Sequence, residues 1–349
     1  MPVNMMMVTR PTIFFKTVIN CYPRLLLFSS IHSTTSAESI EQTIKDAVEA
    51  KTYQNIPDLL ISLKETCGNR NPFSFLSTFP QNMRIQIIDE MLQSFIPVRP
   101  RSHPQLTYNH LLLYTLQSPH PLPLALAILQ RMIHSGCLPI PQAHLLLSSA
   151  WLDHRHQSQS VSGILLEMQK IGYYPDAGTC NYIISSLCAI DQLDEAVKVL
   201  MSMSSIGCIP NLESYGAVIS AMCTVRRTGD SVDLMKQMVE KAGLTPRQGT
   251  VVKVTAALRA NREIWKAVEM IEFLERNGYT VGFESYELVV EGCLECHEYL
   301  LAGKVVMAMT EKGFIPYIRV RQKVIEGLAG VGEWTLACAV RQRLVELGS

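Results

Sequence analysis

Residues 177–211 read AGTCNYIISSLCAIDQLDEAVKVLMSMSSIGCIPN, and this stretch decides the fold because its landmarks recur along the chain. Its Gly207 has counterparts at intervals of 35 or 36 residues, namely Gly136, Gly172, Gly243, Gly278, Gly313 and Gly348. Three residues after most of them lies a proline (Pro139, Pro175, Pro210, Pro246 and Pro316), with Val281 in one place. A fixed period of this length predicts an array of repeated units.

Two further columns of residues indicate that each unit is helical. Four residues before the glycines lie Met132, Met168, Met203, Val239, Leu274, Met309 and Leu344, and eleven before lie Ala125, Val161, Ala196, Val232, Ala267, Ala302 and Ala337. The two columns are seven residues apart, which is two helical turns, so they share one helix face. The glycine and proline then end the helix, because Gly takes the left-handed conformation after the last turn and Pro cannot continue it.

Each unit also contains an earlier apolar run, such as Tyr182 to Cys188, followed by a short polar turn at Asp191 and Gln192. This pattern predicts two antiparallel helices per unit. One such hairpin cannot bury its apolar face alone, so consecutive hairpins must stack. The sequence therefore predicts an all-α fold, an α-solenoid of stacked helix-turn-helix hairpins.

The chain is expected to have three parts. Residues 105–349 form the array, with units at 105–140, 141–176, 177–211, 212–247, 248–282, 283–317 and 318–349. Residues 38–104 have a helical pattern and are interpreted either as a helical N-terminal cap or as degenerate repeats. Trp151, Trp265 and Trp334 begin or flank second helices and are expected to pack between repeats.

Residues 1–37 contain no Asp or Glu, but carry three basic residues and nine Ser or Thr. An acid-free leader whose apolar residues are split by Lys16 and Arg24 is typical of an organelle transit peptide, which would be removed near Ser29 to Ala37. The alternative is a tail with no targeting role. The segment from Arg24 to Ser30 favours the mitochondrial matrix, with the chloroplast as the alternative. The sequence has no run of 18 apolar residues, so no membrane span is predicted.

Three motifs together resemble one repeat family. Thr107-Tyr108-Asn109 and Thr179-Cys180-Asn181 open units, Leu193-Asp194-Glu195-Ala196 opens a second helix, and Gly207-Cys208-Ile209-Pro210-Asn211 closes a unit. The Trp/Leu-Gly/Tyr pattern of tetratricopeptide repeats is absent. Residues 105–349 resemble the pentatricopeptide repeat (PPR) family, specifically its plain class with uniform 35-residue units, of the plant organellar type.

The resemblance implies a right-handed solenoid whose first helices line a concave groove for single-stranded RNA, one base per unit. It also implies that the fifth and last residues of each unit read the base. The RNA-binding candidates carried over in this way are Asn109, Asp176, Asn181, Asn211, Arg247 and Gln322. At other fifth positions, Leu145, Gly216 and Val252 have no side chain able to hydrogen-bond a base, and Glu287 would repel phosphate.

The expected function is non-catalytic RNA binding in organellar RNA processing, stability or translation. The array has 21 Lys and Arg against 23 Asp and Glu, so its net charge is −2. Because phosphate neutralisation dominates affinity for nucleic acid, weak or short-footprint binding is predicted. The basic candidates for the groove are Arg226, Arg227, Arg247, Lys253, Arg259 and Arg262. The alternative function is a protein–protein scaffold in a mitochondrial ribosome or RNA-processing complex.

Motifs of nucleotide-binding loops and serine nucleophiles are absent, so no enzymatic activity and no cofactor are expected. The ten scattered cysteines indicate reduced thiols. Cys293-Leu294-Glu295-Cys296-His297 matches a haem-attachment pattern, but it ends the first helix of its unit. Structural thiols are therefore preferred over a haem or a two-cysteine metal or redox site. His154 and His156 in a polar turn are a further, weaker metal candidate.

Overall fold

The computed structural model describes residues 34–62, 71–157 and 160–348, and within these ranges all regular secondary structure is helical. The expected leader, residues 1–37, lies outside the described residues except for 34–37. The first helices are α1 (Thr34–Glu49), α2 (Ile56–Ser62) and α3 (Gln81–Ser94). Short 3₁₀ turns, η1 (Tyr53–Asn55) and η2 (Ser74–Thr78), lie between them.

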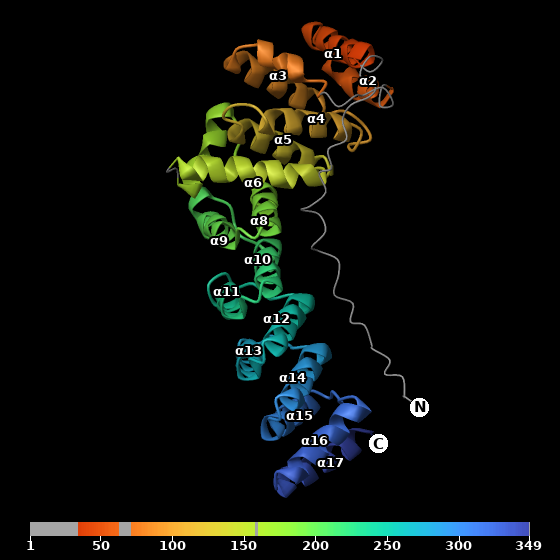
Figure 1. The fold of residues 1–349 in the computed structure, drawn as a ribbon, viewed down its shortest axis with the longest axis vertical. Coiled ribbons are helices and arrows are strands. Elements are labelled where there is room, and N and C mark those ends of the chain that lie inside the picture. The colour runs from red at the N-terminus through yellow and green to blue at the C-terminus, as the bar shows by residue number, and fades with distance from the viewer. Residues whose placement is uncertain (1–33, 63–70, 158–159, 349) are drawn as a thin grey trace, which may run out of the picture.

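From residue 105 onward the helices come in antiparallel pairs (Figure 1). The first helices are α4 (Gln105–Leu116), α6 (Pro141–His156), α8 (Ala177–Ala189), α10 (Leu212–Thr224), α12 (Gln248–Ala260), α14 (Phe283–Glu295) and α16 (Ile318–Gly330). The second helices are α5 (Leu122–His134), α7 (Val161–Leu166) continued by η3 (Glu167–Ile171), α9 (Leu193–Ser202) followed by η4 (Ser204–Ile206), α11 (Thr228–Glu240), α13 (Ile264–Arg276), α15 (Tyr299–Glu311) and α17 (Trp334–Gly348).

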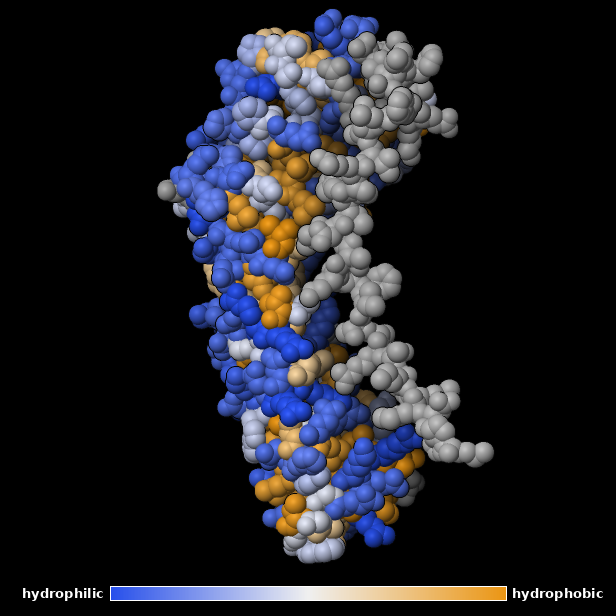
Figure 2. All heavy atoms as spheres, in the orientation of Figure 1, coloured by the Kyte–Doolittle hydropathy of each residue, from blue (hydrophilic) through white to orange (hydrophobic). Residues whose placement is uncertain are grey.

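Each hairpin packs on its neighbours, so the predicted all-α solenoid is confirmed. The first helices from α4 to α16 form one continuous stack, in which each contacts the next. The array is curved, and from α8 to α14 the first helices lie on its concave side while α9, α11 and α13 lie on the other (Figures 1 and 2). We call the exposed side of α4, α6, α8, α10, α12, α14 and α16 the inner face.

The columns of apolar residues that recur in the sequence form the core of the stack. Ala196 and Met203 are fully buried. So are Ala267, the counterpart of Ala196 two units later, and Met309, the counterpart of Met203 three units later. Small side chains at the first column let adjacent helices approach closely, and the long ones fill the space between units. The buried residues form one continuous cluster from Ile40 to Leu344.

The repeating glycines have the conformation that the sequence predicts. Among the described residues, Gly136, Gly172, Gly207, Gly243, Gly278 and Gly313 have φ between +63° and +84°. Each closes a second helix, and L residues with a side chain rarely adopt this conformation. These positions set where each helix stops and where the next unit begins.

We expect Gly207→Ala to lower the free energy of unfolding by about 1 kcal/mol. The cost is conformational, because φ at Gly207 is +80° and an added Cβ meets no atom within 4 Å. Chemical denaturation followed by circular dichroism measures it. The matched control is Gly229→Ala in α11, where a Cβ is also uncrowded but φ is not positive. That change should stabilise the helix, and equal effects at both positions would contradict the explanation.

The tryptophan prediction is only partly correct. Trp151 is fully buried as expected, but it lies within the first helix α6 and not beside a second helix. Trp265 and Trp334 lie at the start of second helices but are 59% and 65% exposed, so their expected packing between repeats is wrong. Within the described part of the chain, no helix is long and apolar enough to cross a bilayer.

Candidate nucleic-acid interface

The structure brings together the fifth and last residues of three units. In the unit 105–140, the Asn109 side-chain oxygen accepts a hydrogen bond from the Ile140 N–H at 3.0 Å. In the unit 283–317, Glu287 Oε1 accepts from the Tyr317 N–H at 3.2 Å. In both cases the last residue is the N-cap of the next first helix. The fifth residue therefore ties its own unit to the start of the next.

Asn181 and Asn211 form the most developed of these pairs. The Asn181 amide nitrogen donates to Asn211 Oδ1 at 3.3 Å and to a Glu213 carboxylate oxygen at 3.1 Å. Its amide oxygen accepts from the Ser214 hydroxyl at 2.6 Å. Asn211 in turn caps α10 in a reciprocal arrangement with Ser214. Asn109 and Asn181 are both buried. Their side-chain amides already form hydrogen bonds within the protein.

The remaining predicted site residues differ in whether their side chains already have hydrogen-bond or ion-pair partners. Asp176 caps α8 by accepting from the Thr179 N–H, and its other oxygen lies 2.6 Å from His134 Nε2. Burial raises the pKa of Asp176, but hydrogen bonds from Thr179 and the charge of His134 hold it below its usual value. The side chains of Arg247 and Gln322 are exposed and make no hydrogen bond or ion pair with the described residues.

Ion pairs occupy two of the arginines that the sequence suggested for the groove. Arg227 lies 2.7 Å from Asp194 and 2.6 Å from Asp230. Arg259 pairs with Glu291 and Glu295 on α14, and its Nε donates to Glu295 at 3.1 Å. Lys253 contacts only the Ser220 hydroxyl, at 3.3 Å. Of this cluster, Arg226, Arg247 and Arg262 have no ion pair within the described ranges.

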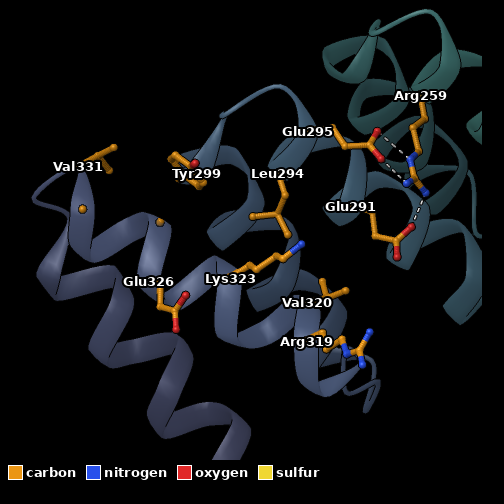
Figure 3. A pocket seen from close by; sticks show the side chains of 12 residues that line it. Arg259, Glu291, Leu294, Glu295, Tyr299, Arg319, Val320, Lys323, Glu326 and Val331 are labelled. Atoms are coloured by element: carbon orange, nitrogen blue, oxygen red, sulfur yellow. Dashed lines mark hydrogen bonds and ion pairs between the residues drawn. The ribbon is translucent and has the colours of Figure 1, made fainter. Parts of the chain in front are cut away.

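A hollow with a volume of about 900 Å³ lies between α12, α14 and α16. Figure 3 shows Arg259 held by two carboxylates at one end, while Lys323 points from α16 toward α14. Arg319 and Lys323 line this hollow without an ion pair to any described residue. They are four residues apart on one helix face, a spacing that is visible in the sequence.

Glu287 is a buried acid at the fifth position of its unit, which the family resemblance predicts to read a base. It is 5% exposed, and its Oε2 has no hydrogen-bond partner among the described residues. Desolvation raises the pKa of Glu287, and the nearby Glu291 raises it further, against the hydrogen bond from the Tyr317 N–H. The ionised form is therefore disfavoured in the folded state.

We expect Glu287→Gln to raise the free energy of unfolding at pH 8 by about 1–2 kcal/mol, because it removes a buried, poorly solvated charge. A group whose folded pKa is raised destabilises the fold when it is ionised. The gain should therefore shrink as pH falls through the folded pKa, and vanish below the unfolded value of about 4.3. Denaturation at pH 8 and pH 4 measures this, with the exposed Glu284→Gln as control. A gain that does not depend on pH would contradict the assignment.

The cysteine and histidine motifs have surroundings that fit structural roles. Cys293 is fully buried on α14, and burial raises its pKa to about 12, which opposes thiolate chemistry. His154 and His156 lie on the last turn of α6, whereas the sequence suggested a turn. No group of three or more potential ligands that could hold a metal ion occurs among the described residues.

Comparisons with known proteins agree with this architecture. Residues 175–224 match the PPR repeat family and residues 213–242 match the PPR repeat. An Arabidopsis thaliana protein, the pentatricopeptide repeat-containing protein At1g06270, is 63% identical over 349 residues, which is the whole of both chains.

Two solved structures of a maize PPR protein, PPR10, are also similar in fold. The free protein is 14% identical, with a TM-score of 0.40 over 89% of this chain and 54% of PPR10. PPR10 in complex with an 18-nucleotide psaJ RNA element is 15% identical, with a TM-score of 0.34 over 89% of this chain and 48% of that one. This chain spans about half the length of PPR10.

The repeated helical hairpins and their stacked first helices define the chain as an α-solenoid repeat protein. With a full-length relative at 63% identity, the chain belongs to the pentatricopeptide repeat family.

Proposed function

We propose that this protein binds single-stranded RNA along its inner face, weakly or over a short footprint. The observation that carries the proposal is the continuous stack of first helices, with the predicted base-reading pairs at its unit junctions. An exposed Arg247, an exposed Gln322 and the hollow lined by Arg319 and Lys323 add groups suited to bases and phosphates.

The buried amides explain why weak binding is expected. Asn109 and Asn181 must exchange an internal hydrogen bond for one to a base, so the net gain per base is small. The carboxylates beside Arg227 and Arg259 also reduce the positive potential of the inner face.

Fluorescence anisotropy with labelled single-stranded oligonucleotides, at 50 and 200 mM salt, tests the proposal. We expect binding that is stronger at low salt and weaker for the same sequence as a duplex. Photo-crosslinks at Asn181 or Asn211 in isolated organelles would place the RNA on the inner face. Failure to retain any single-stranded organellar RNA at low salt would overturn the proposal.

We further propose that the protein acts without catalysis, by occluding or remodelling an RNA segment and so affecting its processing, stability or translation in the mitochondrial matrix. The acid-free leader supports an organelle, and the alternative address is the chloroplast. A fluorescent fusion of residues 1–50 distinguishes the two. Cytosolic fluorescence would contradict both.

A scaffold within a mitochondrial ribosome or RNA-processing complex is a second candidate, which exposed apolar side chains favour. Trp265, Leu300 and Trp334 all lie near the starts of second helices of the last three units. Exposed tryptophan is enriched in protein interfaces. Co-sedimentation with ribosomes that survives RNase treatment would support the scaffold over RNA binding.

A further inference from the structure

A cavity of about 290 Å³ lies between α3, the ends of α4 and α6, the turn that joins α4 to α5, and η3. Its size is near the lower end of the range for small-molecule sites. Its wall combines apolar side chains, such as Ile85 and Leu124, with a group of polar ones. The repeat architecture does not require such a space, since units normally pack without voids.

Several polar groups that line the cavity lack partners among the described residues. The Tyr114 hydroxyl and Arg84 Nε are buried and have no hydrogen bond. His154 is 6% exposed, and its Nδ1 lies 3.2 Å from the Ala150 carbonyl oxygen, so its other ring nitrogen is not used by that contact. Buried polar groups in native proteins are almost always satisfied, by protein, water or a ligand. Two unpartnered groups beside one cavity, together with the buried His154 ring, point to an occupant.

The charges of the lining select the chemistry of that occupant. Arg84 and Lys170 supply two positive charges without an ion pair to any described residue, against one carboxylate, Glu167. His120 lies edge-on to His154, with 6.4 Å between ring centroids, and adds a second imidazole. A guanidinium, an ammonium, a hydroxyl and imidazoles are the donors that commonly bind phosphate.

We propose that this cavity, which we call the N-terminal pocket, binds a small phosphorylated molecule. The phosphate contacts Arg84, Tyr114 and His154, and the apolar wall contacts the body of the ligand. The ends of α4 and α6 line this pocket together with α3, α5 and η3, but no fifth or last residue of a unit does, so the pocket differs from the predicted base-reading positions.

Isothermal titration calorimetry of the full chain tests the proposal with three probes that share a benzene ring. Phenyl phosphate carries both a phosphate and an apolar ring, benzoate replaces the phosphate by a carboxylate, and phenol has no anion. We expect phenyl phosphate to bind at millimolar concentration or better, and the other two at least about 10-fold more weakly. No heat from phenyl phosphate would indicate a cavity that holds only water and would overturn the proposal. Equal binding of benzoate or phenol would also overturn it.

Two variants locate the binding. Arg84→Met should weaken phenyl phosphate by about 10-fold or more, whereas Arg101→Met, an exposed arginine outside the cavity, should have no effect. Tyr114→Phe removes only an unpartnered hydroxyl, so it should weaken phenyl phosphate about 3- to 10-fold without lowering the unfolding midpoint. Wild-type affinity in Tyr114→Phe would show that the anion binds elsewhere and would overturn the assignment, even if Arg84→Met does not fold.

Discussion

Trp151→Ala is expected to lower the free energy of unfolding by about 3–5 kcal/mol, the range for deleting a large aromatic side chain from a close-packed core. Trp151 is fully buried on α6, the helix that contacts both α4 and α8. The indole N–H has no hydrogen-bond partner among the described residues, so the loss comes from packing. Urea denaturation followed by circular dichroism measures the change.

The control for Trp151→Ala is Trp265→Ala, which removes the same atoms from an exposed position on α13. We expect it to change stability by about 0.5 kcal/mol or less. If the two substitutions cost the same, the assignment of one ring to the core and the other to the surface is wrong.

The double substitution Arg319→Glu and Lys323→Glu is expected to weaken RNA binding about 10-fold or more at low salt. Both cations line the hollow of the inner face and have no ion pair with described residues, so they are available to phosphates. Their loss should reduce affinity to a similar extent for all RNA sequences. It should also reduce the number of counterions released on binding, read from the slope of log affinity against log salt concentration, by about two. Fluorescence anisotropy across a salt series measures both quantities.

Lys304→Glu with Arg341→Glu is the matched control. These residues are exposed on the second helices α15 and α17, and the double change alters net charge by the same amount. RNA affinity should fall far less than for the pair on α16. Equal losses would mean that total charge, and not the inner face, governs binding.

The fold was predictable because its signals repeat and are local. The left-handed glycines follow from backbone geometry at single positions such as Gly207, and the small and long apolar columns follow from helical periodicity. Seven copies of each signal removed ambiguity that one copy would have left. The left-handed conformation of the turn residues Asp191, Arg226, Arg262 and His297, all with φ near +60°, was not predictable, because their differing residue types give no recurring signal.

The candidate site was less predictable because its chemistry depends on partners from neighbouring units. The family resemblance paired Asn181 with Asn211 as base-reading residues, but the sequence did not show that Glu213 and Ser214 already occupy the Asn181 amide. Nor did it show that Arg259 faces two carboxylates from the next unit. The exposure of Trp265 likewise depends on how far the preceding turn covers it, which periodicity alone does not determine.

The Tyr173 hydroxyl donates to Asp89 Oδ1 at 2.7 Å, across 84 residues of sequence. This bond joins α3 to the segment after η3 and so passes over the intervening hairpin of α4 and α5. Most other contacts in the array join adjacent units only. The part of the chain before residue 177 should therefore open as one cooperative block, whereas the later hairpins can fray one after another from the C-terminal end. Amide hydrogen exchange should show uniform protection before residue 177 and a graded decline after it.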